Sequence, residues 1–184
     1  MKVIGLVGPI ASGKGTVAKI LAEMGYSPYS LSDRIREETT LRGFETTRQT
    51  LTDIGNELRQ TLSADVWAKR TAELIEKASP EFVVIDAIRN PAELTFLKQK
   101  FGAKIIGIVA DQKKRFEMFK SRGKNTAGIN TWEEFKAIDD QESSQEGSYK
   151  QQVDACLALA DIIIENNETI EDLKQKIENF LNTN

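Results

Sequence analysis

Residues 8–16 read GPIASGKGT and decide the expected fold of this 184-residue chain. The spacing of Gly8, Gly13 and Lys14, with a hydroxyl at Thr16, is typical of a loop that cradles phosphate groups. Glycines let backbone N–H groups turn toward one anion, and the lysine reaches the β- and γ-phosphates. The residues predicted to bind a nucleoside triphosphate, ATP, are Gly8, Ala11, Ser12, Gly13, Lys14, Gly15 and Thr16.

The segments on either side of this loop support the prediction. Residues 3–7 form an apolar run that indicates a buried strand. After the loop, apolar residues fall on one face of a helix, namely Val17, Ile20, Leu21 and Met24. Strand, loop and helix therefore follow one another in the order that the motif requires.

Two oxygen-bearing side chains are predicted to lie beside Mg²⁺, the expected cofactor of ATP. Gly15 takes the position directly after the lysine, so the hydroxyl comes one residue later, at Thr16. The apolar run 82–85 ends in Asp86, a pattern that places a carboxylate next to a phosphate loop. The alternative is that Asp86 only caps a helix or closes a turn.

Composition excludes several other classes of protein. The chain has 25 Lys and Arg against 28 Asp and Glu, a net charge of −3, which argues against a nucleic-acid partner bound by bulk positive charge. It has no histidine and one cysteine, Cys156, which excludes a structural zinc site; the thiol falls on an apolar helical face and is expected in the core. No apolar stretch is long enough to span a bilayer, so we expect a cytoplasmic protein without a membrane partner.

Strand-like and helix-like segments alternate along the chain. This alternation predicts an α/β fold of the P-loop type, with a five-stranded parallel sheet flanked by helices, in a single domain over 1–184. The expected strands are 3–7, 26–31, 82–85, 104–109 and 161–164. Helix starts are predicted at Asn90–Glu93, Thr131–Glu134 and Thr169–Asp172, from their capping residues.

Two insertions interrupt the alternation. Residues 33–78 hold several helices and are predicted to bind the acceptor, while 111–142 are predicted to form a lid. Within the first insertion, Asn56 and Arg59 lie on one helix and are predicted to touch the base or sugar of a substrate.

The residues after the second strand resemble a known phosphate-binding pattern. Asp33 and Arg36 are similar to the D-x-x-R of adenylate kinase and related nucleoside monophosphate kinases. In that family the arginine grips the acceptor phosphate and the acid lies near the reaction centre. Arg89, three residues after Asp86, is similar to the family's second acceptor-phosphate arginine. The resemblance implies that Arg36 and Arg89 bind the acceptor, as bidentate guanidinium groups can, and that Asp33 is catalytic.

The resemblance covers nearly the whole chain. Residues 31–42, 47–59 and 86–94 are similar to the P-loop domain of two-domain deoxycytidylate deaminases, to archaeal adenylate-kinase-related proteins and to phage deoxynucleoside monophosphate kinases. Residues 8–26 and 160–173 instead resemble dephospho-coenzyme A kinase. That family has an Asp-Ala-Asp sequence where this chain has Leu-Ser-Asp, so the acceptor side favours a nucleotide.

The lid prediction also rests on a resemblance. The run from Arg115 to Lys124 is similar to an R-F-E-x-x-x-x-R-G-R pattern of the relatives. It implies that Arg115 and Arg122 are catalytic and neutralise the transferring phosphoryl group. A solvated basic helix is the alternative. Lys124 replaces a third arginine, and Ile138 stands where relatives carry another, so the lid is poor in guanidinium groups.

The expected function is an ATP-dependent phosphotransferase. It moves the γ-phosphoryl group of Mg-ATP to a nucleoside or deoxynucleoside monophosphate, with small-molecule nucleotides as its partners. Two alternatives stay open. One is a dephospho-coenzyme A kinase, and the other is a nucleotide-sensing module that partners a separate nucleotide-metabolising enzyme.

Overall fold

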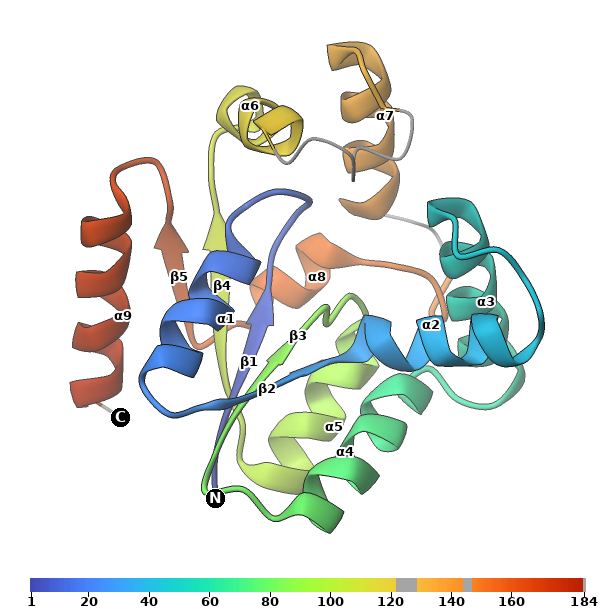
Figure 1. Ribbon diagram of the computed structural model, residues 1–184, viewed down its shortest axis with the longest axis horizontal. Helices are drawn as coiled ribbons and strands as arrows, with labels where there is room; N and C mark the ends of the chain where they lie inside the picture. Colours follow the sequence, from blue (N-terminus) through green and yellow to red (C-terminus); the bar gives the residue numbers. More distant parts are fainter. Residues whose placement is uncertain (122–128, 144–146, 184) are drawn as a thin grey trace.

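The computed structural model describes residues 1–121, 129–143 and 147–183, and in these ranges five parallel strands form one sheet (Figure 1). The strands are β1 (Lys2–Val7), β2 (Ser27–Ser30), β3 (Phe82–Asp86), β4 (Lys104–Val109) and β5 (Ile162–Glu165). Their spatial order is β2-β3-β1-β4-β5. The predicted fold class is confirmed, and each strand begins and ends close to its expected position.

Helices connect the strands and cover both faces of the sheet (Figure 1). The helices are α1 (Lys14–Glu23), α2 (Leu31–Leu41), α3 (Arg48–Thr61), α4 (Val66–Ala78), α5 (Pro91–Phe101), α6 (Gln112–Ser121), α7 (Trp132–Ser143), α8 (Val153–Ala158) and α9 (Ile170–Thr183). Parallel strands need such crossovers, because each chain segment has to return to the same end of the sheet.

The central strand β1 sets the register of the sheet. Its Val3 pairs with Val83 on one side, and its Gly5 pairs with Ile105 on the other. Because all five strands are parallel, their carboxyl ends share one edge of the sheet. The phosphate loop that follows β1 therefore starts beside the end of β3, where Asp86 lies.

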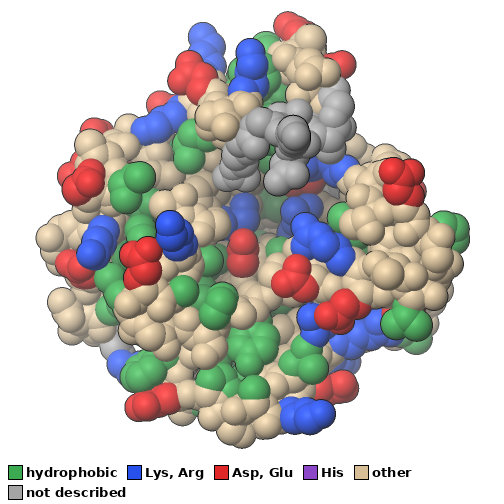
Figure 2. All heavy atoms as spheres, in the orientation of Figure 1, with side chains coloured by type: hydrophobic (Ala, Val, Ile, Leu, Met, Phe, Trp, Pro, Cys, Tyr) green, Lys and Arg blue, Asp and Glu red, His purple; other side chains and the backbone are tan. Residues whose placement is uncertain are grey.

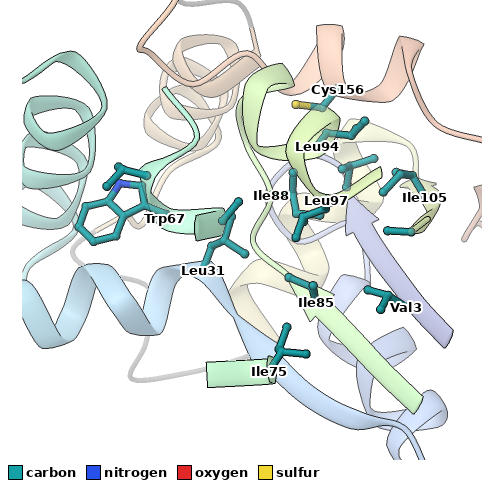
Figure 3. Packing of buried hydrophobic residues seen from close by; sticks show 14 of the residues in the cluster. Val3, Leu31, Trp67, Ile75, Ile85, Ile88, Leu94, Leu97, Ile105 and Cys156 are labelled. Atoms are coloured by element: carbon teal, nitrogen blue, oxygen red, sulfur yellow. The ribbon is translucent and has the colours of Figure 1, made fainter. Parts of the chain in front are cut away.

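Alternate residues of β1 belong to two separate core layers. Ile4 and Leu6 pack with apolar residues of α1 and α9. Val3 and Val7 face the opposite layer, where side chains from α2, α3, α4, α5 and α8 meet. Figure 3 shows part of this second layer, and its labelled residues include Leu31, Trp67, Ile88, Leu94 and Cys156.

The segment 33–78, which is predicted to bind the acceptor, is anchored to this second layer. Trp67 on α4 is completely buried, and its indole Nε1 donates a hydrogen bond to the Gly55 carbonyl of α3 at 3.1 Å. Ile54 and Leu58 of α3 belong to the same core. This segment therefore shares a core cluster with the sheet and lies beside the end of the sheet that carries the phosphate loop (Figure 1).

The predicted helix starts are confirmed. Asn90 and Glu93 form a capping box at the start of α5, which begins with Pro91. Thr131 accepts the Glu134 N–H at 3.2 Å before α7, and Thr169 accepts the Asp172 N–H at 3.2 Å before α9. Each cap satisfies backbone groups that a helix end would otherwise leave without a partner.

A third, smaller apolar cluster joins α6 and α7 to the phosphate loop. Phe119 and Phe135 pack with Ile10 and Ala11 of the loop, and Trp132 stacks beside Phe135. The described part of the predicted lid thus rests directly on the loop.

Among the residues that the structure describes, no helix is long and apolar enough to cross a membrane.

The buried thiol yields a direct test of the fold. Cys156 is fully buried in α8, and this burial raises its pKa, so the reactive thiolate is suppressed. We expect no reaction of the folded protein with a disulfide reagent such as DTNB over several hours, and one equivalent of reaction in guanidinium chloride. Stoichiometric labelling of the folded protein would contradict the packing of α8 against the sheet.

Candidate functional site

Two glycines of the phosphate loop are required by close backbone and side-chain contacts. Gly8 has φ 150°, and a β-carbon there would lie 2.1 Å from the Ile108 carbonyl oxygen. Gly13 has φ 105°, and a β-carbon there would lie 2.2 Å from Nδ2 of Asn166. Both positions therefore exclude any side chain, which keeps the loop tight at the carboxyl edge of the sheet.

Asn166 supports the loop from behind. It follows β5, where its backbone N–H donates to the Val109 carbonyl at 2.8 Å. Its side-chain Nδ2 donates to the Ser12 carbonyl at 3.0 Å. Through one backbone and one side-chain hydrogen bond, Asn166 thus ties the loop to the ends of β4 and β5, a role that sequence analysis did not predict.

The loop and the start of α1 together have a geometry suited to an anion. Gly13 is the N-cap of α1, and it has no side chain to occupy the first N–H groups of the helix. Ala11 at the tip of the loop has φ 57°, an uncommon conformation for a residue with a β-carbon. Lys14 Nζ donates to the Gly8 and Pro9 carbonyls at 2.8 Å each. This geometry gathers backbone dipoles and one ammonium group around one point.

The residues predicted for the donor and its metal fit that assignment. Ser12 Oγ lies inside the loop and is one of two buried side-chain polar atoms in the described ranges that have no hydrogen-bond partner. Thr16 is half-buried on the first turn of α1, and Asp86 ends β3, where its Oδ1 accepts the Ala87 N–H at 2.6 Å. Hydroxyl and carboxylate oxygens are ligands that Mg²⁺ accepts, in company with water and substrate phosphates. No cluster of three or more His, Cys, Asp or Glu residues that could hold a metal occurs in 1–121, 129–143 or 147–183.

A cleft of about 980 Å³ lies between α2, α3, the end of β3 and α7. Figure 2 shows Lys and Arg side chains gathered around a hollow in this face of the molecule. The charged residues that line the cleft are Arg36, Arg48, Arg59, Arg89 and Glu142. The cleft thus has a strongly cationic wall beside the strand end that carries Asp86.

Arg48 and Arg89 converge on one carboxylate in this cleft. Arg89 Nη1 donates to Glu142 Oε1 and to Gln151 Oε1, each at 3.1 Å. Arg48 Nη2 donates to the same Glu142 oxygen. Burial by itself would raise the pKa of the Glu142 carboxyl, but the charges of Arg89, Arg48 and Lys14 outweigh it, so the pKa is lowered. Glu142 is therefore an anion that is stabilised both by the two cleft arginines and by the charge of the phosphate-loop lysine.

Arg36 and Asp33 lie together at the start of α2. Arg36 Nη1 donates to Asp33 Oδ1 at 2.9 Å and to Ser32 Oγ at 2.8 Å. Both side chains are about half exposed, 50% for the arginine and 55% for the acid. Such a pair is weakly held in water, so the Arg36 guanidinium can exchange its partner for an anion in the cleft.

Arg59 differs from the expected substrate contact. Its side chain is 1% exposed, and its Nε donates to Oε1 of the fully buried Glu93 at 2.8 Å. Its Nη1 donates to the Asn56 amide oxygen at 3.3 Å. The other Glu93 oxygen accepts the N–H groups of Arg89 and Asn90. Arg59 therefore fixes the backbone that carries Arg89, and a direct contact of Asn56 or Arg59 with a base or sugar stays a prediction.

Arg115 is expected to be a lid arginine that neutralises the transferring phosphoryl group, and the structure pairs it instead with an acid of α7. It is buried, and Nη1 and Nη2 form a two-pronged ion pair with Asp139 at 2.5 and 2.7 Å. Nη1 also donates to the Ile10 carbonyl of the phosphate loop at 3.0 Å. In this structure Arg115 thus clamps α6, α7 and the loop together. The other lid arginine, Arg122, lies outside the described residues, and catalytic roles for both stay predictions.

The structure brings most of the predicted residues to one edge of the sheet and adds three that sequence analysis missed. Arg48 stands in the segment 47–59 on which the resemblance partly rests, so that segment could have pointed to it. Glu142 and Asn166 offered no local signal, because their partners are 53 and 94 residues away for Glu142 and 154 residues away for Asn166.

Fold and site together define the chain as a nucleotide-binding domain with a P-loop kinase-like fold. Residues 4–146 match the family model described as AAA domain. A UPF0200 protein of Methanosarcina barkeri is 31% identical over 179 residues, which cover 96% of this chain and 92% of that protein. The chain therefore belongs to the AAA domain family and to the UPF0200 proteins.

Two further comparisons extend this result. The UPF0200/UPF0201 protein of Archaeoglobus fulgidus is 35% identical over 185 residues, which cover 98% of this chain; the chain spans only 55% of that relative's length. Among solved structures, shikimate kinase from Bacteroides thetaiotaomicron has a TM-score of 0.60 at 15% identity, covering 98% of each chain. At this identity the likeness shows the fold alone.

The buried pair between Arg59 and Glu93 leads to a stability prediction. We expect Arg59→Ala to lower the free energy of unfolding by about 3–5 kcal/mol, because it leaves the Glu93 carboxylate buried without its counter-ion. Arg36→Ala, which breaks a half-exposed pair, should cost less than about 1 kcal/mol. Urea unfolding measures both values. If Arg59→Ala is as stable as Arg36→Ala, Arg59 is not the structural residue that its burial indicates.

Proposed function

We propose that this chain is an ATP-dependent phosphotransferase whose acceptor is a nucleoside or deoxynucleoside monophosphate. The observation that carries the proposal is the arginine-lined cleft beside the phosphate loop. Arg36, Arg48 and Arg89 present guanidinium groups to one space of about 980 Å³, a size suited to a nucleotide. Planar guanidinium groups bind a phosphate through two parallel hydrogen bonds, which makes them suited to a monophosphate dianion.

The donor side of the reaction falls to the loop. Gly8 to Thr16 would hold the triphosphate through backbone N–H groups, and Lys14 would contact its terminal phosphates. Thr16 and Asp86 would hold Mg²⁺ together with water and the phosphates. When bound, Mg²⁺ neutralises charge on the phosphate oxygens.

Catalysis then consists of positioning and charge neutralisation. The loop at the end of β1 and the cleft at the ends of β2 and β3 bring two anionic groups to one edge of the sheet. Two phosphate groups repel each other in water, and fixed cations offset that repulsion. The bond from the γ-phosphorus to the donor oxygen breaks, and a bond to an acceptor phosphate oxygen forms, with no covalent enzyme intermediate.

Two other functions make different demands on the same residues. In a dephospho-coenzyme A kinase the acceptor is a hydroxyl, and Asp33 would have to take its proton. A regulatory module would bind the triphosphate without forming ADP.

One assay distinguishes the three possibilities. ADP release from Mg-ATP is measured with ribo- and deoxynucleoside monophosphates, with dephospho-coenzyme A, and with shikimate, the ligand named for a structural neighbour from Acinetobacter baumannii. We expect ADP with one class of nucleoside monophosphate. ADP only with dephospho-coenzyme A or shikimate would replace the proposed acceptor, and stoichiometric ATP binding without ADP would favour the regulatory module.

Lys14 provides the first test by substitution. We expect Lys14→Ala to lower turnover by about two to four orders of magnitude, because the ammonium group that neutralises developing phosphate charge is lost. The matched control is Lys19→Ala, which removes an exposed lysine from the same helix and should leave turnover unchanged. Circular dichroism checks that both variants fold. Normal ADP formation by folded Lys14→Ala would remove the loop from the mechanism.

The cleft arginines provide the second test. Arg36→Ala and Arg89→Ala should raise the KM of the acceptor by about 10- to 100-fold and that of ATP far less, because each variant loses a charge-assisted contact worth about 1.5–3 kcal/mol. Lysine at either position should restore little of the affinity for the acceptor, since an ammonium group cannot form the two parallel hydrogen bonds of a guanidinium group. Arg42→Ala is the control, because Arg42 pairs with Glu38 and Glu57 outside the cleft. Equal rises in both KM values would mean that the cleft does not bind the acceptor.

A further inference from the structure

The cleft contains an acid at the place where its cations converge. Glu142 is in the last turn of α7, its side chain is 9% exposed, and it lines the cleft. Its Oε1 accepts from Arg89 at 3.1 Å and also from Arg48. A carboxylate is thus held between two guanidinium groups, an arrangement in which a carboxylate and a phosphate oxygen are interchangeable as acceptors.

The pairing of the cleft arginines shows how their charges are balanced. Arg59 is paired one to one with the buried Glu93, and Arg36 is paired one to one with the half-exposed Asp33. The cationic excess of the cleft therefore resides in Arg48 and Arg89, which share the single charge of Glu142. These two side chains form the strongest anion site in the cleft, and Glu142 occupies it.

We propose that the Glu142 carboxylate is an internal anion in the acceptor-phosphate subsite between Arg48 and Arg89, and that it leaves with the last turn of α7 when an external phosphate binds. The inference rests on the proposed function only in naming the bound anion as the acceptor's phosphate. A phosphate placed between the same two arginines would meet the carboxylate at ion-pair distance. Like charges brought together in this way repel each other, so the two anions exclude each other.

The anchoring of α7 explains why only its end is released. Asp139, three residues before Glu142 and on the same helical face, forms the two-pronged pair with Arg115. Phe135 is fully buried against the loop residues Ile10 and Ala11. The body of α7 is therefore fixed to the phosphate loop, whereas the last turn is held by Arg48 and Arg89, whose side chains are 29% and 33% exposed. Binding of the acceptor phosphate would thereby displace the last turn of α7, a helix that also contacts the phosphate loop.

The test measures binding of inorganic phosphate by titration calorimetry. Glu142→Gln keeps the shape and one carbonyl acceptor but removes the charge. We expect this variant to bind phosphate at least about tenfold more tightly than the unaltered protein. The phosphate loop is a second place where phosphate can bind. In the double variant Glu142→Gln with Arg89→Ala the gain in affinity should vanish, which shows that the added phosphate binding occurs in the cleft and not at the loop.

The matched control is Glu57→Gln. Glu57 also pairs with an arginine, Arg42, at 3.0 Å, and its substitution changes the net charge equally. It should leave phosphate binding within about twofold of the unaltered protein, so that a gain in Glu142→Gln reflects the subsite and not the total charge. Equal or weaker binding by folded Glu142→Gln would overturn the proposal and make Glu142 a structural partner that holds the arginines in place.

A second measurement needs no variant and covers the case in which Glu142→Gln does not fold. Amide hydrogen exchange over residues 139–143 of the unaltered protein is followed with and without saturating phosphate. We expect faster exchange with phosphate, because the last turn of α7 loses its two ion pairs. Unchanged or slower exchange would overturn the proposal. Neither measurement uses ATP. Absence of ADP formation with every acceptor would therefore refute the proposed function, whereas the proposal for Glu142 would still be decided by phosphate binding and hydrogen exchange.

Discussion

The parallel direction of all five strands is the constraint on which the rest of the molecule depends. It places every strand's carboxyl end at one edge, and the residues that follow those ends meet there although they are far apart in sequence. The phosphate loop follows β1, Ser32 follows β2, Arg89 follows β3, and Asn166 follows β5. The apolar faces of the sheet are buried under helices, so polar chemistry is confined to this edge.

The edge concentrates cations, and several of them pair with acids of the same chain. The pairs form a graded series. Arg59 with Glu93 and Arg115 with Asp139 are buried and fix backbone segments in place. Arg36 with Asp33 is half exposed. Buried pairs are costly to break because one charge is left without a counter-ion, whereas exposed pairs exchange partners at little cost. The site therefore has a rigid frame of buried pairs and a set of arginines that can accept a new anion.

The parts of the structure that could be predicted from sequence are those encoded locally. The strands are recognisable as apolar runs, and the phosphate loop is recognisable from nine consecutive residues. The starts of α5, α7 and α9 are recognisable from their capping residues. Residues at or just after the ends of strands, such as Asp86 and Arg89, could be placed as well, because a parallel sheet brings strand ends together.

The partners of charged side chains could not be predicted, because charge alone does not specify burial. Arg59 and Arg115 are predicted from sequence to contact substrate, and the structure pairs each with a buried acid from another helix. Glu142 carried no signal, since its contacts with Arg48 and Arg89 exist only once α7 has packed over the loop. Such pairings are decided by packing between elements, which hydrophobic periodicity does not report.

The contact between Gly13 and Asn166 has a consequence for how this sequence can change over evolutionary time. The Asn166 amide occupies the space that a β-carbon at position 13 would need, and the same amide holds the Ser12 carbonyl. A smaller residue at 166 would relieve the crowding but release the loop, and the positive φ at position 13 would remain. A substitution at position 166 therefore does not make a side chain at position 13 acceptable, and a side chain at position 13 is not compatible with Asn166. The two residues constrain each other although they lie 153 positions apart.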